Sequence, residues 1–270
     1  MTRRQALFLS LGGLPLRASA RTIRLPLRSR VEAFKGSGHW REVRVDQDFD
    51  LGRTALLICD MWNQHWCRGA TERVEILTRT MEPFLQAARA AGVVIIHSPS
   101  DVMDFYKDTP QRRRAIEAPA AQPERSLQLP DPPLPIDDSG GGCDTGESSR
   151  KAWSRQHPAL AIAPVDYITD RGSEVYNVLR QRGVENLLVM GVHTNMCVLN
   201  RSFAIKQMIK WGVRCVLVRD LTDAMYSPKD YPYVSHEQGT NLVIEHIEKH
   251  WCPTVTSAEV LGALKGRSNS

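Results

Sequence analysis

Apolar runs alternate with amphipathic stretches along most of the chain. Short apolar runs bounded by turn residues are typical of strands that are buried on both faces of a sheet. Such strands are expected at 54–59, 93–96, 165–169, 187–190 and 213–218, with a further short strand at Val255. Because helical patterns separate these runs, the sequence predicts an α/β fold with a parallel sheet and right-handed crossovers.

Apolar residues spaced three or four positions apart predict helices at 72–91, 173–182 and 240–250. One long helix is expected from Thr194 onward, with an apolar stripe made by Met196, Leu199, Phe203, Ala204 and Met208. Near the N-terminus, Val43 and Val45 alternate with charged residues and indicate an edge strand. The residues after the last predicted strand are expected to form a polar tail.

The first twenty residues resemble a twin-arginine signal peptide. Arg3 and Arg4 precede an apolar run at 6–16, which is too short to span a bilayer as a mature helix. The small residues Ala18-Ser19-Ala20 then provide a cleavage site. We therefore expect a mature chain that begins near Arg21, forms a single domain to residue 270 and resides in a bacterial periplasm. The alternative is an unstructured basic N-terminus.

The composition is that of a soluble globular protein, with 42% hydrophobic and 24% charged residues. The formal charge of +5 falls to +2 without the leader, which contains three of the 35 basic residues. No basic stripe interleaved with aromatic residues argues for nucleic-acid binding. The expected partner is a small-molecule substrate, and no membrane association is expected after signal cleavage.

Residues 98–157 lack a regular period and contain many prolines together with the run Gly140–Gly142. A loop of this length is uncommon in a compact domain and is usually functional or disordered. Its aromatic and charged residues favour a lid that packs over the edge of the sheet. Acidic residues flank the glycines and form either a cation site or, as we prefer, a solvated acidic turn, because their spacing does not match an EF-hand: Asp137, Asp138, Asp144 and Glu147.

The six cysteines match no zinc-binding spacing. Cys59 and Cys215 lie inside predicted core strands, and most of the others are interpreted as buried thiols as well. Cys67 and Cys143, which lie outside the predicted strands, are the best candidates for a disulfide in an exported protein.

Two side chains with reactive groups follow predicted strands. Asp60 comes directly after the first strand, and Cys197 lies in the first turn of the helix after the fourth. Ligands of open α/β sheets bind at the carboxyl ends of the strands, and a helix N-terminus favours a thiolate. A carboxylate beside a thiol can act as its general base, while backbone N–H groups of the turn 191–197 can stabilise an oxyanion. Alternatively, Cys197 is a small buried apolar residue.

The sequences LLICDMW at 56–62 and GVHTNMCV at 191–198 resemble the isochorismatase-like cysteine hydrolases, which include nicotinamidases. The order of elements matches over residues 50–255. The resemblance implies a three-layer Rossmann-like sheet of strand order 3-2-1-4-5-6 with helices on both faces. It also implies an Asp-Lys-Cys triad in which Cys197 attacks a carbonyl and Asp60 takes the thiol proton, and a cis peptide bond between Val192 and His193. Relatives often form oligomers, so a homo-oligomer is possible.

The triad lysine of the family follows the third strand, where this chain has Asp170 instead. Lys107, Lys151 and Arg171 are the candidates to supply the missing positive charge. Two acids beside one thiol would raise the thiol pKa unless a cation or a helix dipole opposes them.

Nicotinamidases also bind a metal through an Asp and two His residues. The corresponding region offers His65, His97, Asp101 and Asp104 but lacks the Asp-x-His group expected after the second strand. We therefore assign neither a metal nor a cofactor.

The sequence predicts an exported cysteine hydrolase that acts on a small amide or related carbonyl compound. The expected catalytic residues are Cys197, Asp60 and Asp170, and the expected substrate-binding or oxyanion residues are His193, Thr194, Met196, His65 and Trp62. For His65, packing on Trp66 is an equally good interpretation. The alternative function is a periplasmic small-molecule binding or interaction protein that uses the same fold without hydrolysis.

Overall fold

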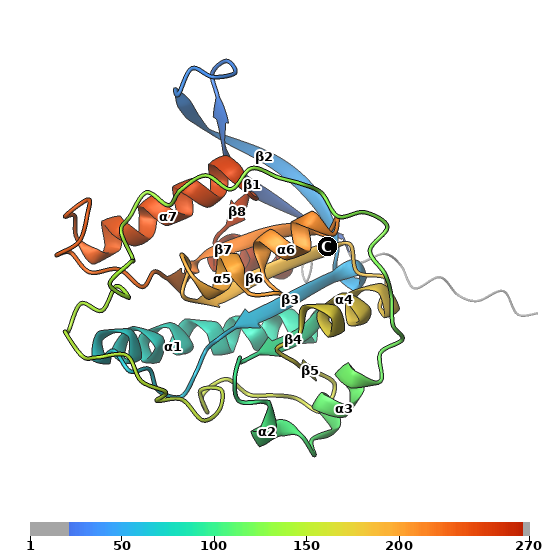
Figure 1. The fold of residues 1–270 in the computed structure, drawn as a ribbon. Helices are drawn as coiled ribbons and strands as arrows, with labels where there is room; N and C mark the ends of the chain where they lie inside the picture. The colour runs from blue at the N-terminus through green and yellow to red at the C-terminus, as the bar shows by residue number, and fades with distance from the viewer. Residues whose placement is uncertain (1–21, 267–270) are drawn as a thin grey trace, which may run out of the picture.

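Eight strands form one sheet in the computed structural model, which describes residues 22–266 (Figure 1). Their order is β2-β1-β8-β7-β6-β3-β4-β5. The strands are β1 (Thr22–Glu32), β2 (Trp40–Asp50), β3 (Thr54–Cys59), β4 (Val94–Ser98), β5 (Tyr167–Ile168), β6 (Asn186–Val192), β7 (Arg214–Asp223) and β8 (Thr254–Val255). The predicted leader lies outside the described residues. Among the helices that are described, none combines the length and apolar character needed to cross a membrane.

The six strands from β3 to β8 are parallel and confirm the predicted fold class. Numbered along the chain from β3, they lie in the order 3-2-1-4-5-6. The sheet differs from the prediction by an added antiparallel hairpin, β1–β2, which joins it where Arg28 pairs with Thr254. The expected edge strand at Val43 and Val45 is β2, whereas β1 was not predicted.

Helices cover both faces of the sheet (Figure 1). On one face, α1 (Arg68–Ala90) and α8 (Ser257–Lys265) pack on side chains such as Leu56 and Ile58. On the other, α4 (Gly172–Gln181), α5 (Cys197–Asn200), α6 (Ile205–Lys210) and α7 (His236–His250) pack on Leu57 and Cys59. Successive residues of β3 thus pack in opposite cores, which explains why every residue of the strand is buried and all but Thr54 are apolar.

The predicted single helix after the fourth strand is wrong, because the structure divides it into α5 and α6. The break begins at Arg201, whose backbone is extended (φ −60°, ψ 151°). Ser202 Oγ accepts a hydrogen bond from the N–H of Gly172, so the break lies against the start of α4. The apolar spacing continues through the break to Phe203, which is fully buried, and therefore gave no sign of it.

The predicted polar tail is also wrong, since α8 follows β8 directly. Thr256 and Glu259 form a capping box at its start, in which each side chain accepts the other's backbone N–H. Val260 on this helix is buried against the α1 face of the sheet.

Residues 98–157 contain two short helices, α2 (Met103–Tyr106) and α3 (Pro110–Ile116), and otherwise irregular chain. The segment packs on the carboxyl end of β3, where Trp153 stacks on Trp62 with ring centroids 4.3 Å apart. Trp62 also forms a β-bridge with Gln156. We call residues 98–157 the lid.

Substituting Gly172 by Ala should destabilise the fold, because an added Cβ would lie 1.9 Å from the carbonyl oxygen of Ser202. We expect a loss of about 2 kcal/mol or more in the free energy of unfolding, measured by urea denaturation. Gly262→Ala is the matched helical control, since nothing lies within 4 Å of its Cβ position. It should stabilise the protein by about 0.5–1 kcal/mol. Equal effects of the two substitutions would contradict the close approach at Ser202.

Candidate active site

Asp60 is a fully buried carboxylate at the carboxyl end of β3. Its Oδ1 accepts the backbone N–H of Ser100 at 2.6 Å, and its Oδ2 lies 3.1 Å from Arg201 Nε. Burial raises the pKa of Asp60 above its ordinary value of 3.8, and the charge of Arg201 opposes that rise. Its backbone has a positive φ of 46°, a strained conformation of the kind found at functional sites.

Cys197 begins α5, close to Asp60 and Arg201. Burial and the Asp60 carboxylate raise the pKa of its thiol, while Arg201 lowers it. The thiol is therefore protonated at neutral pH and stands beside a carboxylate able to accept its proton. The expected cis peptide bond between Val192 and His193 is confirmed in the turn that leads to Cys197.

Arg201 supplies the positive charge that the sequence did not place. Its guanidinium bridges two carboxylates, with Nε on Asp60 and Nη2 3.2 Å from Asp101 Oδ2. Arg201 lies four residues after Cys197, a spacing that brings side chains to one side of a helical turn. That spacing is the sequence signal from which Arg201 could have been predicted as the cation.

The three expected cations lie elsewhere. Lys151 donates to the carbonyl oxygen of Asp101, and Arg171 is an exposed residue 3.8 Å from Glu174. Within residues 22–266, Lys107 has no ion pair with Asp60. None of the three therefore replaces the family lysine beside the thiol.

Asp170 follows the end of β5, and it is connected to the site through Asp101. Its Oδ2 accepts the backbone N–H of Asp101 at 3.2 Å. Asp101 in turn holds Arg201 through its carboxylate. Asp170 thus orients the partner of Arg201, and its carboxylate is not the one beside Cys197.

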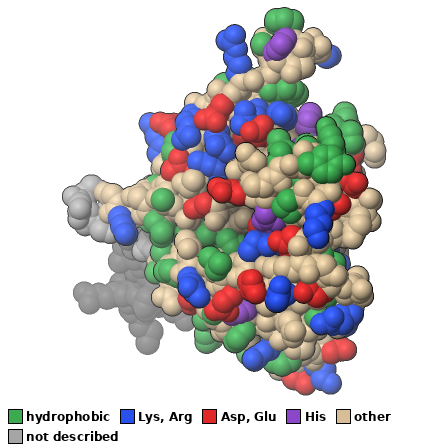
Figure 2. Space-filling model, turned by 90° about the vertical axis from the view of Figure 1, so that its left-hand side faces the viewer, with side chains coloured by type: hydrophobic (Ala, Val, Ile, Leu, Met, Phe, Trp, Pro, Cys, Tyr) green, Lys and Arg blue, Asp and Glu red, His purple; other side chains and the backbone are tan. Residues whose placement is uncertain are grey.

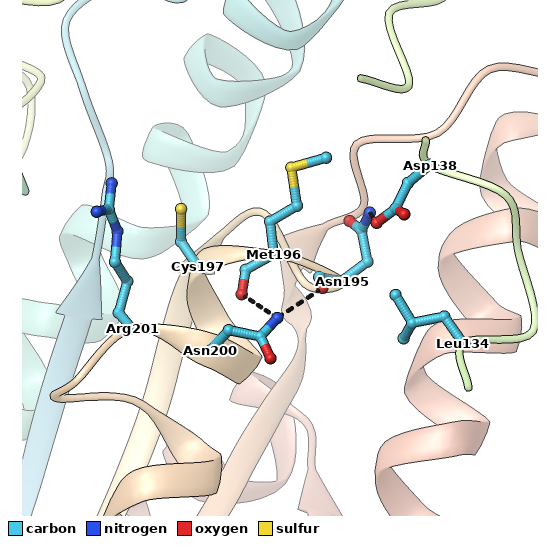
Figure 3. Close-up of a pocket in the computed structure, with 7 residues that line it drawn as sticks. All are labelled: Leu134, Asp138, Asn195, Met196, Cys197, Asn200 and Arg201. Carbon is cyan, nitrogen blue, oxygen red and sulfur yellow. Dashed lines mark hydrogen bonds between the residues drawn. The ribbon is translucent and has the colours of Figure 1, made fainter. Parts of the chain in front are cut away.

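A cavity of about 420 Å³ opens beside Cys197 (Figure 3). Two elements contribute to it: the α5 turn and the lid. Its lining consists of Leu134, Asp138, Asn195, Met196, Cys197, Asn200 and Arg201. Asp138 of the lid accepts a hydrogen bond from Asn195 Nδ2 at 2.8 Å, which ties the lid to the nucleophile turn. In Figure 3, Arg201 and Asp138 stand at opposite ends of this lining.

The backbone N–H group of Cys197 is available at the nucleophile. The N–H groups of Met196 and Val198 both donate to the carbonyl oxygen of His193. Among the described residues, the N–H of Cys197 between them donates to none. It can therefore serve a developing oxyanion.

Of the five expected substrate-binding residues, Met196 alone lines this cavity. Thr194 has a structural contact, since its Oγ1 lies 2.7 Å from Thr222 Oγ1 and joins the turn to β7. The Trp62 indole donates to the carbonyl oxygen of Ser100, and its ring stacks on Trp153 of the lid.

His65 and His193 meet edge to face in a buried group next to the cavity, with ring centroids 4.9 Å apart. Burial lowers the pKa of His65 to about 4 and that of His193 to about 3. Both imidazoles are consequently neutral at pH 7. His65 accepts the N–H of Cys67 through Nδ1 and stacks on Trp153, in addition to its contact with Trp66.

The histidines and acids of the nicotinamidase-like metal region do not converge among the described residues. His97 is fully buried, with Nδ1 3.0 Å from Gln156 Oε1 and Nε2 3.1 Å from Asp166 Oδ2. Asp101 is paired with Arg201. These residues are engaged in protein contacts and do not fit a metal site of that kind.

The molecular surface mixes charges of both signs. On the face shown in Figure 2, Lys and Arg side chains are interspersed with Asp and Glu over the whole body of the molecule. The absence of nucleic-acid binding stays a prediction from the sequence.

No family model and no curated protein sequence matches the chain. Solved structures do match it. A cysteine hydrolase from Pseudomonas syringae pv. phaseolicola 1448A is 21% identical with a TM-score of 0.53, over 81% of this chain and 95% of that one. The chain has the fold of the isochorismatase-like cysteine hydrolases.

Two further structures are similar to a smaller degree. An isochorismatase from Pseudomonas putida KT2440 is 16% identical over 77% of this chain and 90% of its own, with a TM-score of 0.48. An isochorismatase family protein from Burkholderia thailandensis is 17% identical over 79% and 96%, with a TM-score of 0.45. In this chain, the cation beside the cysteine is Arg201, which directly follows the short helix that Cys197 begins.

Replacing Arg201 by Met should slow alkylation of Cys197 by iodoacetamide. Removing the guanidinium raises the thiol pKa, and one pKa unit lowers the thiolate fraction about tenfold, so we expect a roughly tenfold slower reaction at neutral pH. The rate is measured by mass spectrometry of the Cys197 peptide. Arg171→Met, an exposed arginine outside the site, is the control and should leave the rate unchanged. An unchanged rate in Arg201→Met would refute this role of Arg201.

Proposed function

We propose that the protein is a cysteine hydrolase that cleaves a small amide or related carbonyl compound through a covalent intermediate on Cys197. The observation that carries this proposal is the group formed by Cys197, the buried Asp60 carboxylate and Arg201 at the side of a cavity. Nucleophile, base and cation thus occur together in a space that accepts a small molecule. The shared fold supports the proposal at the level of architecture.

In the first half-reaction, the proton of the Cys197 thiol moves to Asp60 as the sulfur attacks the carbonyl carbon. The negative charge that develops on the carbonyl oxygen is stabilised by the N–H of Cys197. The tetrahedral adduct then collapses, the carbon–nitrogen bond breaks, and Asp60 returns the proton to the leaving amine. A thioester on Cys197 remains.

In the second half-reaction, water attacks the thioester while Asp60 takes one of its protons. Collapse of this adduct breaks the carbon–sulfur bond, releases a carboxylic acid and restores the thiol. Arg201 favours the ionised form of Asp60 between the two steps, because its positive charge opposes the burial that raises the pKa of Asp60. Asp60 can therefore accept a proton twice in each cycle.

Asp60→Asn should lower kcat/KM on any amide substrate found by at least about a hundredfold, the usual contribution of a general base. Asp170→Asn is the matched control, because it removes a carboxylate that bonds only the backbone N–H of Asp101. It should lower kcat/KM less than about tenfold, as expected for a group that orients another. Equal losses in the two variants would place Asp170 in the reaction as the third catalytic residue.

The substrate class is tested with a panel of small amides, ureas and vinyl ethers. Turnover of an amide or a urea should be accompanied by an acylated or carbamoylated Cys197 peptide in quenched reactions, and turnover should vanish in Cys197→Ala. If no compound turns over, and Cys197→Ala binds small molecules of the panel as tightly as the unaltered protein, the non-hydrolytic binding function replaces the hydrolase.

We propose further that the chain is exported through the twin-arginine pathway and works in the periplasm. The support is the sequence of the leader, with Arg3 and Arg4 before a short apolar run and a small-residue cleavage site. Protein purified from the periplasm of an expressing bacterium should begin near Arg21, as read by N-terminal sequencing. Arg3→Lys with Arg4→Lys should retain the precursor in the cytoplasm. A mature protein that begins at Met1 or Thr2 would refute export.

A further inference from the structure

Two thiols from distant parts of the chain meet where the lid contacts the start of α1. Cys67 precedes the first turn of α1, and Cys143 follows the glycine run of the lid. Both are free thiols in the structure, and their sulfur atoms lie within 4.8 Å of each other. They share a small apolar cluster with Met225 and Trp66.

Contacts that do not involve sulfur hold the two segments together. Arg73 of α1 lies 2.6 Å from the carboxylate of Asp144, and the N–H of Gly69 donates to Thr145 Oγ1 at 3.2 Å. Gly142 approaches the backbone of Met225 so closely that a Cβ would lie 2.2 Å from its carbonyl oxygen. The thiols are therefore brought together by the docking of the lid on α1.

The same stretch of lid reaches the Cys197 cavity. Asp138, five residues before Cys143, lines the cavity and accepts a hydrogen bond from Asn195. Leu134 lines it as well. A covalent bond at Cys143 would thus anchor the lid next to the residues that it contributes to the cavity wall.

We propose that Cys67 and Cys143 form a disulfide that fastens the lid to the start of α1. An external disulfide, such as oxidised glutathione, accepts the electrons. The Cys143 thiolate attacks it and releases one thiol, and the Cys67 thiolate then attacks the mixed disulfide on Cys143 and releases the second. Two protein thiols lose two protons and two electrons, and one external disulfide becomes two thiols.

The surroundings of the two thiols suit this order of events. Cys143 is partly exposed, whereas Cys67 is buried. Burial raises the pKa of Cys143, but hydrogen bonds from Cys67 and Thr145 outweigh it and leave that pKa below its ordinary value. Burial raises the pKa of Cys67. Cys143 is the accessible and more readily ionised thiol that meets an external disulfide first.

A metal ion fits the same place less well. Its donors would be Cys67, Cys143 and Asp144, one short of the four ligands of a closed zinc site. Both oxygens of Asp144 are already bonded to Arg73, at 2.6 and 3.3 Å, and the guanidinium charge opposes a cation there. We therefore favour the disulfide.

The test uses the mature chain with Cys197→Ser, so that its result is independent of hydrolysis. The protein is incubated with oxidised glutathione, remaining thiols are blocked with a maleimide, and peptides are mapped without reduction. We expect a Cys67–Cys143 cross-linked peptide. Oxidation should also raise the midpoint of thermal unfolding by about 5 °C or more and slow tryptic cleavage of the lid.

Cys143→Ser in the same background should abolish both the rise in the unfolding midpoint and the slower tryptic cleavage. The protein with both thiols intact, kept under reducing conditions, is a second reference that does not depend on the folding of the Cys143→Ser variant. The proposal is overturned if Cys67 and Cys143 remain open to maleimide after oxidation, or if either pairs with another cysteine. It is also overturned if zinc bound under reducing conditions protects both thiols and native mass spectrometry shows one ion per chain.

Discussion

The ion pair between Asp60 and Arg201 is the interaction on which the site depends. A carboxylate without solvent exposure is strongly destabilised unless charges and hydrogen bonds compensate for the lost water. Arg201 and the N–H of Ser100 provide that compensation. The pair also controls the chemistry, because the pKa of the Cys197 thiol rises with the charge of Asp60 and falls with that of Arg201. Without Arg201, the Asp60 carboxyl and the Cys197 thiol would both lose the positive charge that lowers their pKa values.

Several features of the fold follow from bringing Arg201 to Asp60. Arg201 directly follows α5, and its side chain reaches the Asp60 carboxylate at the end of β3 from the point where the backbone becomes extended. The resulting break has to be accommodated, and the glycine at 172 allows α4 to start against Ser202. Asp101 then holds the other side of the guanidinium. The interruption of the helix thus begins at the residue that pairs with Asp60.

Much of this architecture could be predicted from the sequence. The apolar runs located the parallel strands, and the ends of β3 and β6 located Asp60 and the turn before Cys197. The break at Arg201 could not be predicted in this way, because the apolar spacing from Leu199 to Met208 records which residues face the core and is insensitive to a change of backbone direction between them. The expectation of a cation after the third strand came from the family resemblance. The resemblance holds for the fold, but the cation beside Cys197 is Arg201, directly after α5.

The lid could not be placed from the sequence for a related reason: its position depends on tertiary contacts that have no period. Those contacts give the cavity two unlike ends, with the Arg201 guanidinium at one and the Asp138 carboxylate at the other, and apolar side chains such as Met196 between them (Figure 3). The Arg201 guanidinium is held there by Asp60 and Asp101, and the Asp138 carboxylate by Asn195. The contacts that place the lid thus also bring the second charged group to the cavity. The cavity wall is therefore as hard to predict from the periodicity of the sequence as the lid itself.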